Sequence, residues 1–280
     1  MRIAGIDVGS RTVKLVIVDR GRVSVVRKRE NSFDPLSVCR ELLAGENYDC
    51  IIATGYGRRL CIESLGAATI TEIKAAAVGA RFLYPGCRTV LDIGGQDTKA
   101  IALDAGSRVG RFEMNDKCAA GTGRFLEVMA MALGCNVAAF SELAASASRR
   151  HAVSSTCTVF AESEIVGLIS RGADRGEVAG GIIDSVASRA VSLARRVGIA
   201  PDFVFIGGVA LTGALRQELA RRLNLAVQVP VDPQMVTALG CALSAQPNDD
   251  TRKARSCAKP SSGLATQVAL FEYNHSLHRL

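Results

Sequence analysis

The stretch IDVGSRTVKLVIVD, residues 6–19, decides the fold, because it aligns without gaps on LDIGGQDTKAIALD, residues 91–104. Both copies have an aspartate between apolar residues, a glycine turn, a lysine in the same place and a β-rich stretch that ends in aspartate. This pattern predicts a strand, a tight turn and a returning strand in each copy. Two such hairpins indicate a duplicated βββαβα-type unit, and hence an α/β protein with two related lobes around a cleft.

The rest of the chain supplies the other elements of two such lobes. The expected strands are 23–29, 49–53, 88–93, 98–104, 107–114 and 202–206, and the expected helices are 35–44, 72–83, 119–133, 160–170, 177–197, 211–223 and 233–245. Lobe I is expected to cover 1–84 with about 233–246, and lobe II is expected to cover 85–232. Residues 247–280 are polar at first and lack a period, which predicts a disordered tail.

Composition excludes several classes of protein. The net charge is +7, but the 34 basic residues are scattered and only 5% of residues are aromatic, so nucleic acid is not expected as the partner. No apolar run approaches the roughly 20 residues of a membrane span. The chain enters a strand directly from MRIAGIDVGS without the pattern of a signal peptide, and a cytoplasmic location is expected.

The glycine turns favour a phosphate site. Asp7 and Asp92 each end a buried strand, where both carboxylates are expected to face one Mg²⁺ through water. Gly9 and the Gly94-Gly95 pair allow close backbone approach, so that consecutive N–H groups can contact phosphate oxygens. Ser10, Thr12 and Lys14 add hydroxyl groups and a positive charge, and Gly207-Gly208 end a third strand before a helix. Neither a P-loop nor a dinucleotide-binding glycine motif occurs in these turns.

Two cysteines stand before predicted helices, in NDKCAAGTGRF (115–125) and SSTCTVFAESE (154–164). The positive end of a helix stabilises the thiolate form, which is the form that binds metal. Two thiolates are too few for a cubane cluster, which normally takes four, but a symmetric dimer supplies the other two. By spacing alone, two cysteines such as Cys118 and Cys157 are more often part of the core packing than metal ligands.

Longer segments carry a resemblance to a known family. The three glycine turns resemble the two phosphate motifs and the adenosine motif of the actin, sugar-kinase and heat-shock-chaperone ATPase superfamily, over roughly residues 3–245. NDKCAAGTGRFLEVMA and SSTCTVFAESE, with ATGYGRR (53–59), SVASRAVSLARRVGI (185–199) and GGVALTGALR (207–216), are similar to segments of the reductive activator ATPases of 2-hydroxyacyl-CoA dehydratases. The same wider family includes the ATPase subunits of benzoyl-CoA reductases.

The resemblance implies an actin-like, ribonuclease H-like ATPase fold and a homodimer with one 4Fe-4S cluster held by Cys118 and Cys157 of both copies. It implies ATP-driven delivery of one low-potential electron from a donor such as ferredoxin or flavodoxin to a partner iron–sulfur dehydratase or reductase acting on a CoA thioester. The ATP or ADP site with Mg²⁺ is implied at Asp7, Gly9, Ser10, Arg11, Thr12, Val13, Lys14, Asp92, Gly94, Gly95, Gln96, Asp97, Gly207 and Gly208. One departure is EIKAAA at 72–77, where many relatives have a Cys-His pair.

Some assignments stay open at this point. Gln96 and Asp97 either position the attacking water or only shape the second turn. Glu162 and Glu164 are assigned to a helix surface or a dimer contact in preference to catalysis. The main alternative function is a sugar or amino-sugar kinase of the same superfamily, with Asp116 as the general base. The other is an actin-like polymer or scaffold, which binds ATP without further chemistry.

Overall fold

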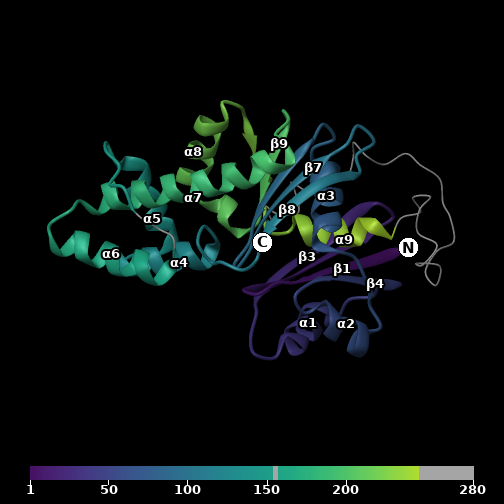
Figure 1. Cartoon of the computed structure of the whole chain (residues 1–280). Coiled ribbons are helices and arrows are strands. Elements are labelled where there is room, and N and C mark those ends of the chain that lie inside the picture. The colour runs from purple at the N-terminus through teal and green to yellow at the C-terminus, as the bar shows by residue number, and fades with distance from the viewer. Residues whose placement is uncertain (154–156, 246–280) are drawn as a thin grey trace. The chain divides into compact units, whose positions relative to one another are not determined.

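The computed structural model describes residues 1–153 and 157–245, and these residues form two compact units (Figure 1). Unit 1 contains Met1–Gly86 and the described residues from Pro230 to Ala245, and unit 2 contains Cys87–Val229. Each unit is built on a five-stranded sheet. Numbered by their order within a unit, the strands of both sheets follow the same arrangement, 3-2-1-4-5. The duplication predicted from the two hairpins is therefore confirmed for the whole sheet.

The sheet of unit 1 begins with an antiparallel meander and continues with parallel strands. The meander consists of β1 (Arg2–Val8), β2 (Thr12–Asp19) and β3 (Arg22–Glu30). On the other side of β1, β4 (Cys50–Gly55) and β5 (Ala68–Thr69) pair in parallel. β1 is almost completely buried and most of β2 is buried, which explains why they read as nearly continuous apolar runs.

Four helices belong to unit 1: α1 (Pro35–Leu43), α2 (Arg58–Leu65), α3 (Glu72–Leu83) and α9 (Val236–Ser244). α3 and α9 pack against each other, and α9 also contacts β1, β2 and β4. The contact is close because a Cβ at Gly79 or Gly240 would overlap the backbone of the facing helix. This packing brings the described C-terminal part of the chain back onto the first sheet.

Unit 2 repeats the sheet and adds a larger helical part. Its strands are β6 (Thr89–Ile93), β7 (Thr98–Leu103), β8 (Val109–Asn115), β9 (Phe203–Ile206) and β10 (Val227–Gln228). Its helices are α4 (Gly123–Ala132), α5 (Val137–Ser146), α6 (Thr158–Ser170), α7 (Arg175–Val197) and α8 (Gly213–Leu223), with a 3₁₀ turn at Gly208–Leu211. α7 runs from the group formed by α4, α5 and α6 onto β7 and β8 (Figure 1).

The structure corrects several predicted elements. The helix expected at 119–133 begins at Gly123, so Cys118 lies before a separate turn, and the helix expected at 211–223 begins at Gly213, after a 3₁₀ turn at Gly208–Leu211. The prediction missed α2, α5, β5 and β10, which are short or weakly amphipathic. The predicted disordered tail from 247 lies outside the described residues. None of the described helices could cross a bilayer alone, whereas α4 and α5 have the necessary length and composition only as a pair bent by 76°.

Candidate functional site

The first hairpin holds a buried carboxylate against a lysine. Asp7 and Lys14 are direct partners in the β1–β2 register, and Lys14 Nζ lies 3.0 Å from Asp7 Oδ2. The Gly9 N–H donates to the carbonyl of Thr12 at 3.1 Å and closes the turn. Asn31, the residue after β3, supports the same turn, because its side-chain amide donates to the Gly9 carbonyl at 2.7 Å. Lys14 therefore neutralises Asp7 in this structure.

The second hairpin contains the same pair and one further carboxylate. Asp92 and Lys99 are partners in the β6–β7 register, and Lys99 Nζ lies 4.0 Å from Asp92 Oδ2 and 2.7 Å from Asp97 Oδ1. The Gly94 N–H closes the turn by donating to the carbonyl of Asp97 at 2.9 Å. All three charged side chains are buried. Sequence reasoning noted a lysine at this place in both copies but took only Lys14 as a site residue, although the repeat itself indicates Lys99.

Glycines with positive φ end the parallel strand beside each hairpin. Gly207 (φ +88) follows β9, and a Cβ there would overlap the carbonyl of Ile93 and come within 2.5 Å of Asp92 Oδ1. Gly55 (φ +89) ends β4, where a Cβ would overlap the backbone of Val8 next to Asp7. Sequence reasoning selected Gly207 and missed Gly55, although both occur in segments used for the resemblance. The duplication therefore includes the strand ends that lie against the two aspartates.

The remaining residues predicted for the phosphate site differ in accessibility. Arg11 and Gln96 are exposed, and Ser10 is half-buried at the tip of its turn. Val13 is completely buried in the core of unit 1, so only its backbone is available to a ligand. The carboxylate of Asp97 is held by Lys99, which favours the interpretation that Asp97 shapes the turn.

The second turn is attached directly to α4. The N–H groups of Gly123 and Arg124, the first two residues of that helix, donate to the carbonyls of Gly94 and Gly95, both at 2.9 Å. These N–H groups have no partner within the helix, so the hairpin satisfies two of the free donors at its N-terminus. A shift of Gly94 or Gly95 must therefore move or uncap the beginning of α4.

Both candidate metal-binding cysteines lie in unit 2, beside helices that pack together. Cys118 is half-buried against the core of unit 2, and its carbonyl accepts a hydrogen bond of 3.3 Å from the Asn115 side chain. Cys157, also half-buried, is the N-cap residue of α6. α6 lies against α4 (Figure 1). Within residues 1–153 and 157–245, no group of three or more His, Cys, Asp or Glu side chains is arranged to hold a metal ion.

Comparison with known proteins assigns these features to a family. A model described as the BadF/BadG/BcrA/BcrD ATPase family matches residues 4–245. The (R)-2-hydroxyglutaryl-CoA dehydratase activating ATPase of Acidaminococcus fermentans is 42% identical over 250 residues, which cover 86% of this chain and 95% of the relative. The activator of lactoyl-CoA dehydratase of Anaerotignum propionicum is 44% identical over 250 residues, covering 86% and 96%.

A solved structure agrees with this assignment. The activator of the 2-hydroxyisocaproyl-CoA dehydratase from Clostridium difficile, with bound ADPNP, matches with a TM-score of 0.82 at 37% identity, over 94% of this chain and 100% of that chain. The predicted actin-like ATPase fold with two duplicated lobes is confirmed. The sequence similarity, the fold and the paired hairpins agree, and the chain belongs to the BadF/BadG/BcrA/BcrD ATPase family.

Proposed function

We propose that this protein is an ATP-driven activator, which delivers one low-potential electron to a partner iron–sulfur enzyme that acts on a CoA thioester. The observation that carries the proposal is the attachment of the Gly94-Gly95 turn to the N-terminus of α4, because α4 follows the turn that begins at Cys118. Relatives that are 42% and 44% identical are named as activators of CoA-thioester dehydratases, which supports the same function.

In this proposal both hairpins contact one ATP or ADP. The backbone from Gly9 to Lys14 and the Gly94-Gly95 turn bind phosphate oxygens, and Asp7 and Asp92 hold Mg²⁺ through its water ligands. The Gly207-Gly208 turn takes the nucleoside. Gln96, exposed at the tip of the second turn, positions the water that attacks the terminal phosphate. Lys14 and Lys99 orient the buried aspartates, since each lies beside the carboxylate in its hairpin.

The proposed cluster is a 4Fe-4S centre between two copies of the chain. When bound, such a cluster supplies a carrier for one electron. Cys118 and Cys157 fit the role because both are partly accessible, and Cys157 stands at the positive end of α6. One copy supplies two thiolates and a second copy supplies two more. The partner would be an iron–sulfur dehydratase or reductase, and the donor a ferredoxin or flavodoxin.

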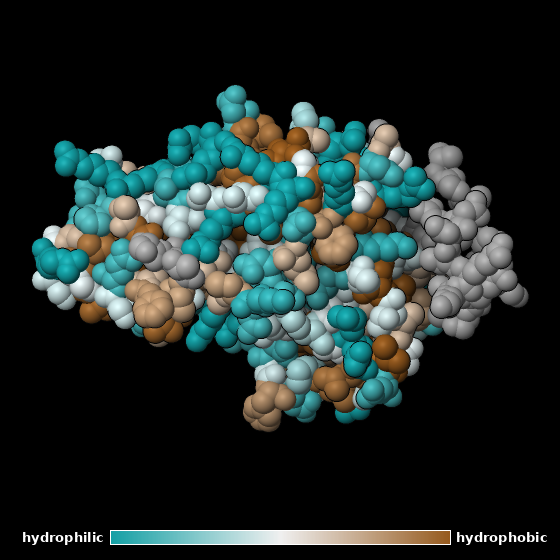
Figure 2. Space-filling view, in the orientation of Figure 1, coloured by the Kyte–Doolittle hydropathy of each residue, from teal (hydrophilic) through white to brown (hydrophobic). Residues whose placement is uncertain are grey.

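Exposed apolar side chains support an association of two copies near this site. Val159, Phe160 and Val166 of α6 and Met131 of α4 are exposed large hydrophobic residues, with Phe160 72% exposed. Apolar surface is visible over α4 and α6 in the space-filling view (Figure 2). An exposed apolar face next to Cys157 is the kind of surface that a second copy would cover.

Anaerobic purification followed by iron and sulfide analysis tests the proposal. We expect about four irons and four sulfides per dimer, which are lost in Cys118→Ser and in Cys157→Ser. Cys135→Ser is the matched control, because Cys135 is also a half-buried thiol of unit 2 and is expected to leave the iron content unchanged. Iron-free protein that still hydrolyses ATP after cluster reconstitution would contradict the activator function, and Asp116, exposed after β8, would then be tested as the base of a kinase.

A further inference from the structure

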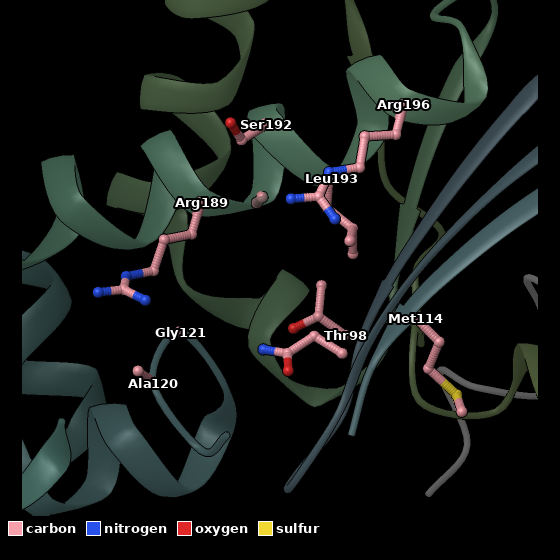
Figure 3. A pocket seen from close by; sticks show the side chains of 10 residues that line it. Thr98, Met114, Ala120, Gly121, Arg189, Ser192, Leu193 and Arg196 are labelled. Carbon is pink, nitrogen blue, oxygen red and sulfur yellow. The ribbon is translucent and has the colours of Figure 1, made fainter. Parts of the chain in front are cut away.

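Unit 2 contains a pocket that the proposed ATPase chemistry does not use. Its volume is about 320 Å³, and it is open to solvent beside the turn that follows Cys118 (Figure 3). Apolar side chains of α7, among them Ala190 and Leu193, line it together with Ala120 and Gly121 of the turn. The volume lies at the lower end of the range for small-ligand sites.

Two arginines of α7 give the pocket its charge. Arg189 and Arg196 stand seven residues apart and therefore lie on one face of the helix, and both line the pocket. The Arg196 guanidinium lies beside Leu193, and that of Arg189 extends on the side of Gly121 (Figure 3). Arg196 is in a long, exposed ion pair with Glu113, 3.9 Å between Nη1 and Oε2. Because exposed pairs of this kind contribute little stability, a bound anion could replace Glu113 at small cost.

Polar groups in the lining of the pocket also favour an anionic ligand. Thr98, Asn115 and Ser192 add hydroxyl and amide groups to the lining. Within the described residues, no hydrogen bond is found for the backbone N–H groups of Ala120 and Gly121, although both residues are buried. Buried backbone donors nearly always have a partner, and successive N–H groups in a turn are typical ligands of anions.

The pocket lies between the second hairpin and the Cys118 turn. Thr98 follows Asp97 directly and pairs with Asn115 across β7 and β8. The Asn115 side chain in turn donates to the carbonyl of Cys118. Gly121 has a φ of +90° and packs on the side chain of Arg189, with 3.7 Å between Arg189 Cδ and the position of a Gly121 Cβ. A ligand in the pocket would therefore hold the Cys118 turn against α7.

We propose that this pocket binds an organic anion, whose carboxylate or phosphate group lies between Arg189 and Arg196 and whose apolar part lies against Ala190 and Leu193. The anion is either a free small molecule or an acidic side chain of a protein partner, since both present the same chemistry. Occupation would stabilise one position of the turn that carries Cys118. None of the residues that line the pocket is among the proposed nucleotide ligands, so the site does not require the proposed function.

Calorimetric titration of the anaerobically purified full chain tests this site. Glutarate and phenyl phosphate serve as free anions, and the blocked peptide acetyl-Gly-Glu-Gly-amide serves as an acidic side chain. We expect binding with a Kd of about 1 mM or lower, weakened about tenfold by Arg189→Gln or Arg196→Gln because each removes a charge-assisted hydrogen bond. Arg195→Gln is the matched control, since Arg195 is an exposed arginine of the same helix outside the pocket lining.

The outcomes separate the two sources of the anion. Tighter binding of the peptide assigns the pocket to a protein side chain, and tighter binding of glutarate or phenyl phosphate assigns it to a free ligand. No binding of any of the three probes would overturn the proposal. Equal weakening by all three arginine substitutions would also overturn it, because the effect would then come from net charge alone. Neither iron nor ATP hydrolysis is needed for this readout, so its failure is distinguishable from a failure of the proposed function.

Discussion

At the residue scale, each hairpin combines a buried aspartate with a buried or half-buried lysine. In unit 2 the lysine is shared and more deeply buried, because Lys99 lies near both Asp92 and Asp97 and is only 3% exposed. Buried charges persist when they are paired, and removal of one partner takes away part of the interaction that offsets their burial. Lys99 therefore supports both the stability of unit 2 and the shape of the turn proposed to bind phosphate.

Lys99→Met tests this role. The substitution removes the buried cation that lies against Asp92 and Asp97, and we expect the free energy of unfolding to fall by about 3–5 kcal/mol, with loss of ATP hydrolysis. Urea unfolding and an ATPase assay measure the two effects. Arg108→Met, which removes the exposed ion pair with Asp104, is the control and is expected to change neither. Equal stability of the two variants would show that Lys99 contributes no more than a surface cation.

The glycines with positive φ offer a second test at this scale. Gly207 and Gly198 have nearly the same φ, +88 and +87, but only at Gly207 would a Cβ meet other atoms, whereas nothing lies within 4 Å at Gly198. Alanine at either position carries a backbone strain of about 1–3 kcal/mol. We expect Gly207→Ala to cost about 1–3 kcal/mol more through overlap with the Ile93 carbonyl.

The variants Gly207→Ala and Gly198→Ala also distinguish an effect on stability from an effect on nucleotide binding. Gly207→Ala is expected to weaken nucleotide binding, because the added methyl group pushes against Ile93 and Asp92, while Gly198→Ala is expected to leave it unchanged. Thermal unfolding and titration with ADP measure the two quantities. If both variants bind ADP as the wild type does, the close approach at Gly207 does not position the second hairpin.

At the scale of elements, Glu218 of α8 ties the segment after α5 to the rest of unit 2. Its carboxylate is almost completely buried and accepts hydrogen bonds of 2.7 Å from Arg221 and Arg222 of its own helix. Arg150, which stands between α5 and α6, lies 2.7 Å away and also pairs with Asp184 of α7. This cluster fixes one end of the stretch that leads to Cys157.

The cluster makes stability depend on pH. Burial acts to raise the pKa of Glu218, but hydrogen bonds from the three arginines outweigh burial and lower that pKa to about 2. The unfolded value is about 4.3, so the stabilisation is fully present above that pH and is lost as the pH falls toward 2. The difference corresponds to about 3 kcal/mol. We expect Glu218→Gln to lose this amount at neutral pH.

Urea unfolding at about pH 7, 4 and 3 measures this dependence. The difference between wild type and Glu218→Gln should shrink steadily as the pH falls, because the wild-type carboxylate becomes protonated. Glu142→Gln, at an exposed position of α5, is the control and should show a small difference at every pH. A constant large difference between wild type and Glu218→Gln would contradict the assignment to the charge of Glu218.

The sequence did not predict α2, α5, β5 and β10 because each lacks a clear local signal. α2 contributes one fully buried residue, Cys61, and its N-cap residue is Gly57, which has no side chain that could cap the helix. The sequence therefore shows neither an apolar period nor a capping residue for this helix. α5 is capped by Asn136, but it follows α4 so closely that the two read as one apolar stretch interrupted at Gly134. β5 and β10 have two residues each, too few to show an alternation.

At the scale of the whole molecule, the proposed dimer can be tested through the exposed apolar residues of α6. Phe160→Ser removes a large apolar side chain beside Cys157, and we expect the dissociation constant of the dimer to rise at least about tenfold. Phe33→Ser in unit 1 is the matched control, because Phe33 is completely exposed and lies away from α4 and α6 in the chain. Size-exclusion chromatography with light scattering, under anaerobic conditions, measures the association.

The two variants together show whether the α6 face forms the dimer contact. A shift toward monomer in Phe160→Ser, with Phe33→Ser unchanged, would assign the α6 face to the dimer contact. A dimer that persists in both variants would place the contact elsewhere and would leave the exposed face of α6 to a partner protein.

By itself, the sequence determined the duplication, the β-hairpin form of both repeats, the turns at Gly9 and Gly94-Gly95, and the family. These features are local, since strand period, turn chemistry and motif spacing are all contained within short segments. Only the tertiary structure decided that Lys99 lies between Asp92 and Asp97, that Gly55 matches Gly207, that the second turn caps α4, and that Arg150 reaches Glu218. Such contacts depend on which strand and helix ends meet in space, and most of them join residues that are far apart along the chain.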